Sequence, residues 1–278
     1  RSELKEAGHQ FQTDHSDTEV LVHGYRQWGI DKLLSKLEGD YGFALWDTHE
    51  ESLYLVRDRV GVKPLYFTTQ QGMIAFASEI KALVVHPDVE RDIDPIAMGH
   101  YLSFLTTPAP LTMFKGIYKL PAGHYLHINK AGKYKATQYW EPFPESDLSS
   151  EIITASNSQD IEKQYIANIR ERLSNAVDKR MMSDVPLGVF LSGGIDSSTN
   201  VALMSRSMSR PVDTFTVGFS DHQHLNELEY ARQVAKKFKT NHHEVMISES
   251  DMRGYLADLI HHQDAVSYTH LRAHETKP

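Results

Sequence analysis

The stretch VFLSGGIDSSTNVALM, residues 189–204, joins an apolar run to a segment of helical period through a glycine turn. The apolar run ends at Ser192 and predicts a strand. The segment after Asp196 spaces its apolar residues as a helix does, which predicts a helix to about residue 208. A strand that enters a helix through a glycine turn is typical of parallel α/β sheets, so the stretch predicts that architecture around it.

The flanking sequence repeats the alternation of strand and helix. After a first helix at 161–181, strands are expected at 186–192, 212–219 and 242–248, and helices at 196–208, 226–238 and 252–262. Strands separated by helices of this length are connected by right-handed crossovers. The second half therefore predicts a doubly wound parallel sheet.

The first half has a different pattern. Ser16-Asp17-Thr18-Glu19 fits a capping box, and glycines end two successive predicted helices at residues 29 and 39. Short aromatic and β-branched segments with period two follow, and we expect them to form an antiparallel meander. These segments lie at 39–47, 52–61, 64–69 and 73–79. A helix at 94–104, a hairpin-like pair at 116–129 and a last strand at 136–140 complete this α+β half.

Residues 141–160 are rich in proline, serine and acidic residues and show no periodicity. We therefore expect a first domain at 1–142, a linker at 143–160 and a second domain at 161–264. The remaining residues, AVSYTHLRAHETKP at 265–278, show no core pattern. We expect that tail to be an artefact unrelated to the domain before it.

Composition excludes several classes of function. The net charge of −8 disfavours a nucleic-acid surface, which needs a basic face. No apolar run is long enough to span a membrane, and residues 1–10 lack the apolar core of a signal peptide. We therefore expect a cytoplasmic protein. The chain has no cysteine, so disulfides, thiolate zinc sites and cysteine nucleophiles are excluded for these 278 residues.

The glycine turn is suited to an anionic ligand. Helix starts present unpaired N–H groups and the positive end of the helix dipole, and this end of a parallel strand is where ligands bind in α/β sheets. Gly193 and Gly194 let the backbone approach phosphate closely. Serine hydroxyls add donors, and Asp196 can hold a magnesium ion bound to the phosphates. The pattern is not a Walker A loop, because no Gly-Lys-Ser/Thr follows.

Together, SGGIDSS at 192–198 and its setting resemble the pyrophosphate loop of the N-type ATP pyrophosphatases. The first half resembles the glutaminase domain of the asparagine synthetase family through SDTEVLVHGYRQWG, LEGDYGFALWD, LVRDRVGVKPLYF and FASEIKAL. FKGIYKLPAGHYL, TFTVGF and NELEYARQVAKKFKTNHHEV continue the resemblance in order to about residue 264. The implied fold is a partial N-terminal-nucleophile hydrolase sandwich of α/β/β/α layers, followed by a partial doubly wound α/β domain.

The resemblance implies an ATP-dependent ligase. Aspartate would be amidated to asparagine through aspartyl-adenylate, with glutamine as nitrogen donor and release of AMP and pyrophosphate. Small-molecule substrates (ATP, glutamine and aspartate) and Mg²⁺ are therefore expected, with no nucleic-acid or membrane partner. The family also forms dimers, so a homodimer is expected of the full-length protein.

Site residues are carried over by position. Asp17 matches the carboxylate that holds the amino group of glutamine, although the residues alone favour a simpler role in the first helical turn. Phe190 and Val217 match positions whose backbone contacts adenine. The full set expected to bind ATP and pyrophosphate is Phe190, Leu191, Ser192, Gly193, Gly194, Asp196, Ser197, Ser198 and Val217.

Two other polar groups receive structural interpretations. Arg57, Asp58, Arg59 and Lys63 belong to a family signature, RDRxGxKPLY, to which we assign scaffold and domain-contact work. His242 and His243 are adjacent in a predicted strand, so their side chains point to opposite faces and do not favour a shared metal ion.

The glutaminase of this family uses an N-terminal cysteine, which these residues do not contain. We therefore expect an internal fragment without catalytic residues and without glutaminase activity. Two alternatives stay open: another ligase of the same family, such as the branch that closes β-lactam rings, or a non-enzymatic ATP-binding remnant.

Overall fold

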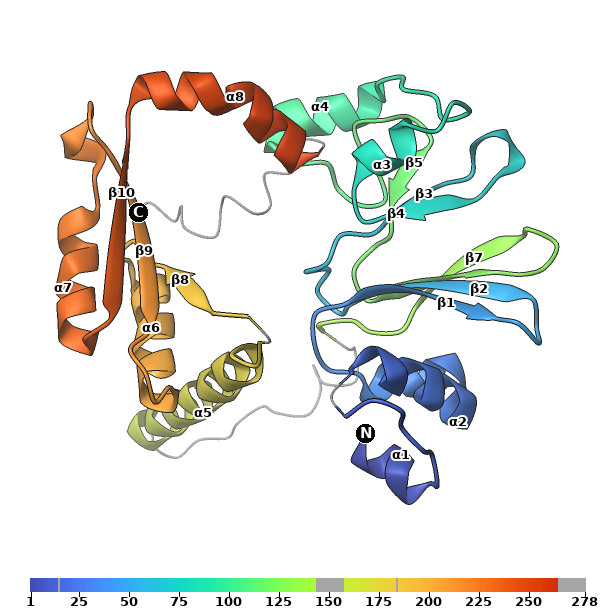
Figure 1. The fold of residues 1–278 in the computed structure, drawn as a ribbon, viewed down its shortest axis with the longest axis horizontal. Coiled ribbons are helices and arrows are strands. Elements are labelled where there is room, and N and C mark those ends of the chain that lie inside the picture. The colour runs from blue at the N-terminus through green and yellow to red at the C-terminus, as the bar shows by residue number, and fades with distance from the viewer. Residues whose placement is uncertain (15, 144–157, 184, 265–278) are drawn as a thin grey trace. The chain divides into compact units, whose positions relative to one another are not determined.

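The computed structural model describes residues 1–14, 16–143, 158–183 and 185–264 (Figure 1). The described residues form two compact units, one before residue 144 and one at residues 158–262. Within these ranges, no helix combines the length and the apolar character that crossing a membrane requires.

The first unit begins with α1 (Ser2–Glu6) and α2 (Thr18–Lys36). At Gly29 the backbone leaves the helical region, with φ 73° and ψ 177°. This confirms that a glycine ends the first predicted helix and that a second one follows. Leu33 and Leu34 of the second part are buried.

Two antiparallel sheets follow the helices. The first sheet has the order β1-β2-β6-β7, and the second has the order β4-β3-β5. The strands of the first sheet are β1 (Gly42–Asp47), β2 (Ser52–Arg57), β6 (His124–Ile128) and β7 (Tyr134–Gln138). Those of the second are β3 (Tyr66–Thr68), β4 (Ala75–Ala77) and β5 (Ile117–Lys119).

The expectation of one meander and one hairpin is wrong in its connections. β2 and β3 lie in different sheets, and so do β5 and β6, although each pair is consecutive in the sequence. Arg57 explains the first change, because its guanidinium donates to three loop carbonyls and turns the chain out of the first sheet. Gly123 explains the second. Its φ is 66°, and a Cβ there would lie 2.5 Å from the Trp140 carbonyl oxygen.

Burial separates the layers of this unit. Leu55 and Leu126 of the first sheet share a core with Phe67 of the second, so the two sheets face each other. On its other face the first sheet packs against Leu34 of α2, and the second packs against α3 (Ile80–Val84). Figure 1 shows this order of layers, which is the expected α/β/β/α sandwich.

The remaining elements of the first unit are short. The predicted helix at 94–104 is confirmed as α4 (Pro95–Phe104), and Asp94 caps it by accepting from the N–H groups of Ile96 (2.8 Å) and Ala97 (3.0 Å). A 3₁₀ turn, η1 (Gln70–Gly72), connects β3 to β4.

The second unit alternates strands and helices as predicted. Its three strands are parallel and have the order β10-β9-β8. The elements are α5 (Ser158–Arg180), β8 (Gly188–Phe190), α6 (Ile195–Ser207), β9 (Asp213–Phe219), η3 (Gln223–Leu225), α7 (Leu228–Phe238), β10 (Asn241–Ile247) and α8 (Glu249–Gln263).

The two crossover helices α6 and α7 share one face of this sheet. Leu191, Val201 of α6, and Ala231 and Ala235 of α7 form its buried core. Successive right-handed crossovers stay on one face when the strand order advances in one direction, as it does from β8 to β10. On the opposite face, Phe190, Val217 and Val245 are 77%, 47% and 52% exposed.

Candidate functional site

The glycine turn between β8 and α6 has the backbone that its sequence predicts. Gly193 has a φ of 84°, in the region that favours glycine. A Cβ at Gly193 would lie 2.4 Å from the Cβ of Tyr230 in α7, so only glycine fits. The loop therefore lies directly against the start of α7.

Serine side chains fix the inside of the turn. The hydroxyls of Ser192 and Ser197 lie 3.1 Å apart, and Ser192 Oγ accepts from the N–H of Gly194 (3.2 Å). Ser197 is buried. Ser198 Oγ is also buried and has no hydrogen-bond partner among the described residues. The hydroxyls of Ser192 and Ser197 therefore shape the loop.

The free backbone donors of the site come from α6. The first N–H groups of a helix have no intrahelical acceptor and lie at the positive end of the dipole, so they attract anions. Gly194 is the capping residue of α6, and Asp196 is exposed in the first turn. The arrangement fits a phosphate group, and one exposed carboxylate beside it fits Mg²⁺, which keeps several waters and binds through phosphates.

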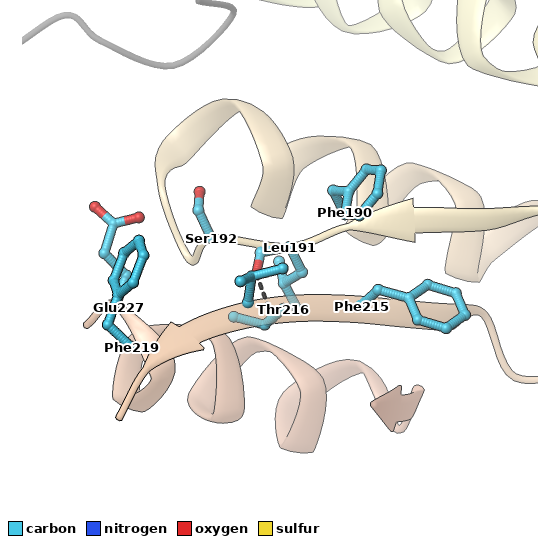
Figure 2. Close-up of a pocket in the computed structure, with 8 residues that line it drawn as sticks. Phe190, Leu191, Ser192, Phe215, Thr216, Phe219 and Glu227 are labelled. Carbon is cyan, nitrogen blue, oxygen red and sulfur yellow. Dashed lines mark hydrogen bonds between the residues drawn. The ribbon is translucent and has the colours of Figure 1, made fainter. Parts of the chain in front are cut away.

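A hollow of about 250 Å³ adjoins the loop (Figure 2). Ser192 lines it together with aromatic residues of β8 and β9, and Thr216 Oγ1 donates to the Leu191 carbonyl beneath it. Figure 2 shows Phe190 and Phe215 at one end and Phe219 and Glu227 at the other. The lining residues are Phe190, Leu191, Ser192, Phe215, Thr216, Val217, Phe219 and Glu227.

Four of the residues expected from the sequence line this hollow, namely Phe190, Leu191, Ser192 and Val217. The sequence analysis missed Phe215, Thr216, Phe219 and Glu227. Alternation along β9 could have identified Phe215 and Phe219, which share a face with Val217. Glu227 is placed by its neighbour Asn226, whose side chain bonds both the N–H (2.7 Å) and the carbonyl (2.9 Å) of Phe219.

Asp17 lies in the first unit, in a separate hollow of about 740 Å³. It is exposed at the start of α2, and its side chain does not cap the helix. The Thr18 hydroxyl donates to it at 3.3 Å. The other lining residues include Tyr41, Phe43 and Lys63. Asp17 thus offers a carboxylate to a roomy hollow, as binding an ammonium group requires.

The capping box at this helix start is half formed. The Glu19 N–H donates to Ser16 Oγ at 3.4 Å, as predicted. The Glu19 carboxylate turns to the preceding loop instead, where it accepts from the N–H groups of Gln12 (2.6 Å) and Thr13 (2.9 Å).

The charged loop after β2 has contacts that support its scaffold assignment. Asp58 is fully buried, and its carboxylate accepts from the N–H groups of Val60 (3.2 Å), Val62 (2.9 Å) and Lys63 (2.9 Å). The buried Arg57 guanidinium holds the other side of the loop; burial lowers its pKa. Lys63 is thereby fixed at the edge of the hollow that contains Asp17.

The histidine pair on β10 lies as predicted, with side chains on opposite faces. His242 Nδ1 lies 2.9 Å from Thr214 Oγ1, whereas His243 stacks on Phe215 with ring centroids 5.0 Å apart. In the described part of the chain, no three His, Asp or Glu side chains are grouped to hold a metal ion.

Comparison with known proteins gives two family matches. The family described as "Glutamine amidotransferase domain" matches residues 1–140, and the family described as "Asparagine synthase" matches residues 168–274. The second match ends inside the predicted tail, whose limits stay a prediction.

Similar curated proteins span both matches. Asparagine synthetase (glutamine-hydrolyzing) 3 of Bacillus subtilis (strain 168) is 32% identical over 94% of this chain and 42% of that protein. Asparagine synthetase (glutamine-hydrolyzing) 1 of the same organism is 33% identical over 95% and 39%. Amidase chyE of Penicillium rubens is 28% identical over 90% and 37%. The chain therefore spans about two fifths of the length of these relatives.

A solved structure of glutamine phosphoribosylpyrophosphate amidotransferase from B. subtilis aligns with 87% of this chain and 42% of that chain. Sequence identity is 17% and the TM-score is 0.33, so nothing is inferred from this similarity.

Proposed function

We propose a function for this chain from the family to which it belongs, that of the glutamine-hydrolysing asparagine synthetases. The proposed activity is ATP-dependent amidation of aspartate to asparagine with glutamine as nitrogen donor. Aspartyl-adenylate would form with release of pyrophosphate, and nitrogen would then displace AMP. The observation that carries the proposal is the Ser-Gly-Gly loop at the carboxyl end of a parallel strand, in a chain that also contains an amidotransferase domain.

In the synthetase half, the chain's own groups would bind the leaving pyrophosphate. The first N–H groups of α6 and the Ser192 hydroxyl would donate to its oxygens. Asp196 would hold Mg²⁺, which supplies charge neutralisation when bound. Backbone at Phe190 and Val217 would contact the adenine. Because fixed hydrogen-bond donors would bind the phosphate, negative charge that develops on the leaving group would be stabilised without reorganisation of the site.

In the amidotransferase half, the proposed role of this chain is amino-acid binding. The Asp17 carboxylate would hold the ammonium group of glutamine in the hollow of the first unit. Hydrolysis of the amide in this family requires a cysteine thiol, which these 278 residues do not supply. We therefore assign binding, and not glutamine cleavage, to the residues present.

ATP binding measured by calorimetry, with and without Mg²⁺, tests the nucleotide site. Asp196→Asn should weaken binding in the presence of Mg²⁺ and have much less effect in its absence. Glu171→Gln, an exposed change on α5, is the matched control and should leave binding unchanged. Equal ATP affinity for Asp196→Asn and the wild type under both conditions would contradict the assignment of this residue.

A second experiment separates the ligase from the alternatives. Pyrophosphate release from ATP is measured with aspartate, with other carboxylic acids and with no acid. Aspartate-dependent release supports the proposed reaction. Release with another acid favours a different acceptor. ATP binding without release under any condition supports a non-enzymatic nucleotide-binding role.

We also propose that the protein acts in the cytoplasm on small molecules and that the full-length form is a homodimer. The acidic net charge of −8 supports the absence of a nucleic-acid partner.

A further inference from the structure

Four polar side chains form a line that begins at Glu19, two residues after Asp17. Its members are Glu19, His23, His9 and Gln27. His9 Nδ1 lies 3.1 Å from His23 Nδ1, and His23 Nε2 lies 3.3 Å from Glu19 Oε1. At the other end, His9 Nε2 lies 2.8 Å from Gln27 Oε1. Glu19 lies in the first turn of α2, and Asp17 is the residue directly before that helix.

The Glu19 carboxylate is an acceptor in each of its contacts. It accepts from the Thr13 hydroxyl and from the N–H groups of Gln12 and Thr13, and these donors, with the Thr13 hydroxyl first, lower its pKa to about 2. It is therefore an anion that only accepts, so His23 Nε2 must donate to it. The Gln27 Oε1 atom likewise accepts a hydrogen bond from His9 Nε2.

One contact then remains, between the two Nδ1 atoms, and it needs one N–H donor. Either ring can supply that donor, because each ring already donates from its Nε2 atom. The three contacts are therefore satisfied together when the pair of rings carries three N–H groups.

The hydrogen bonds of this line, and those of Glu19 to Gln12 and Thr13, hold residues 9–13 against the start of α2. The Phe11 ring packs on His23 with centroids 4.7 Å apart, and the Arg1 guanidinium lies 4.4 Å from the centroid of Phe11. Arg1 also donates to the Thr13 carbonyl. The charged groups that face the two histidines are therefore Glu19 directly and Arg1 across Phe11.

Few contacts fix the orientation of the Asp17 side chain. Its side chain accepts from the neighbouring Thr18 hydroxyl, at 3.3 Å. The direction of its carboxylate therefore depends on the backbone at the start of α2, which the bonds of Glu19 hold in place. We propose that Glu19 is a positioning residue for the amino-acid site. The inference rests on the proposed function in taking Asp17 as the ligand for the ammonium group.

Amide hydrogen exchange tests whether Glu19 holds residues 12 and 13 in place. Glu19→Gln should lower the protection of the Gln12 and Thr13 amides about tenfold or more, because charged acceptors are lost. Glu6→Gln, which removes an exposed carboxylate of α1, should change neither amide. Unchanged protection in Glu19→Gln would overturn the inference.

Glutamine titrations followed by NMR test whether Glu19 affects Asp17 and the proposed amino-acid site. Glu19→Gln should move the resonances of Asp17 and weaken glutamine binding about tenfold. If Asp17 does not respond to Glu19→Gln, the positioning role fails, whatever glutamine does. If Asp17→Asn leaves glutamine binding unchanged, or if glutamine does not bind the wild type, the proposed function of this site fails. The Asp17 resonances would still decide the positioning role in that case.

Discussion

Gly193 combines a conformational and a steric requirement at one position. Its φ of 84° disfavours a side chain, and an added Cβ would meet α7 at 2.4 Å. We expect Gly193→Ala to lower the free energy of unfolding of the second unit by about 2–4 kcal/mol. Urea titration measures this change.

Gly254 provides the matched control. It lies inside α8, where an added Cβ meets no atom within 4 Å. Gly254→Ala should therefore be neutral or stabilise by up to about 1 kcal/mol, through helix propensity. Similar losses for Gly193→Ala and Gly254→Ala would show that packing at the loop is not the cause.

Asp58 is a buried charge that satisfies three N–H groups. Asp58→Asn replaces one acceptor oxygen by a donor that faces these groups, so we expect a loss of about 1–3 kcal/mol in the first unit. The exposed Asp92→Asn should stay within about 0.5 kcal/mol of the wild type. A loss under 0.5 kcal/mol for Asp58→Asn would argue against a scaffold role.

The lowered pKa of Glu19, about 2 against an ordinary 4.5, makes its contribution to stability depend on pH. A depressed carboxylate pKa stabilises the fold above the ordinary value, and the effect is lost as pH falls through the folded value. The difference in urea midpoint between the wild type and Glu19→Gln should therefore be constant above about pH 4.5 and shrink towards pH 2. A difference that grows on acidification would contradict the assigned contacts.

The local geometry of the proposed nucleotide site was predictable from the sequence. Gly193 and Ser197 follow from the glycine turn and the helix start, because the same few residues create and use that geometry. Phe215 and Glu227 were missed because they come from separate elements, β9 and the residue before α7. Only the pairing of β8 with β9 and the bonds of Asn226 bring them to the loop.

Between elements, α7 and β10 are linked by an ion pair. Arg232 Nε and Nη2 each donate to a Glu244 carboxylate oxygen at 2.7 Å. This hydrogen-bonded pair, with Arg232 the main cause, lowers the pKa of Glu244 from 4.5. Because Arg232 is 53% exposed and solvent screens the pair, we expect Arg232→Gln to lower stability only slightly.

The same pair has a predictable pH dependence. Its contribution should be present above about pH 4.5, the ordinary value, and decrease as acid protonates Glu244. Stability of the wild type and Arg232→Gln, compared across that range, tests this. A large loss of stability, or one that persists in acid, would mean that Arg232 acts through packing.

The existence of elements was predictable from periodicity, but the sheets that they join were not. Asp94 with its following proline marks the start of α4, and Gly29 marks the break in α2. By contrast, nothing in the period-two segments distinguishes a meander from two facing sheets. That choice depends on the hydrogen bonds of Arg57 to distant carbonyls, such as that of Leu120, which no local pattern reveals.

At the scale of each whole unit, the parallel sheet presents apolar side chains to solvent on one face. Val245 is 52% exposed there, next to Val217 on the neighbouring strand. Exposed apolar patches of this kind promote self-association. We expect the chain to aggregate, and Val245→Thr to raise the monomer fraction in sedimentation velocity with a change in stability of about 0.5 kcal/mol or less.

Val85, 75% exposed in the first unit, gives the control for this prediction. Val85→Thr removes a similar methyl group away from the sheet and should leave the monomer fraction unchanged. A wild-type chain that is monomeric and melts cooperatively would contradict the prediction of aggregation.

β8 is an edge strand in the described sheet, joined to β9 through three residue pairs. Because β8 is short and lies at the edge, its separation from β9 costs less free energy than the separation of a strand inside the sheet. The glycine loop continues directly from β8, so molecules with an open edge also lack the loop. A nucleotide would then bind with its intrinsic affinity multiplied by the closed fraction. Sheet pairing and the proposed nucleotide binding would thereby be coupled, and a substitution in β8 away from the ligand would still weaken that binding.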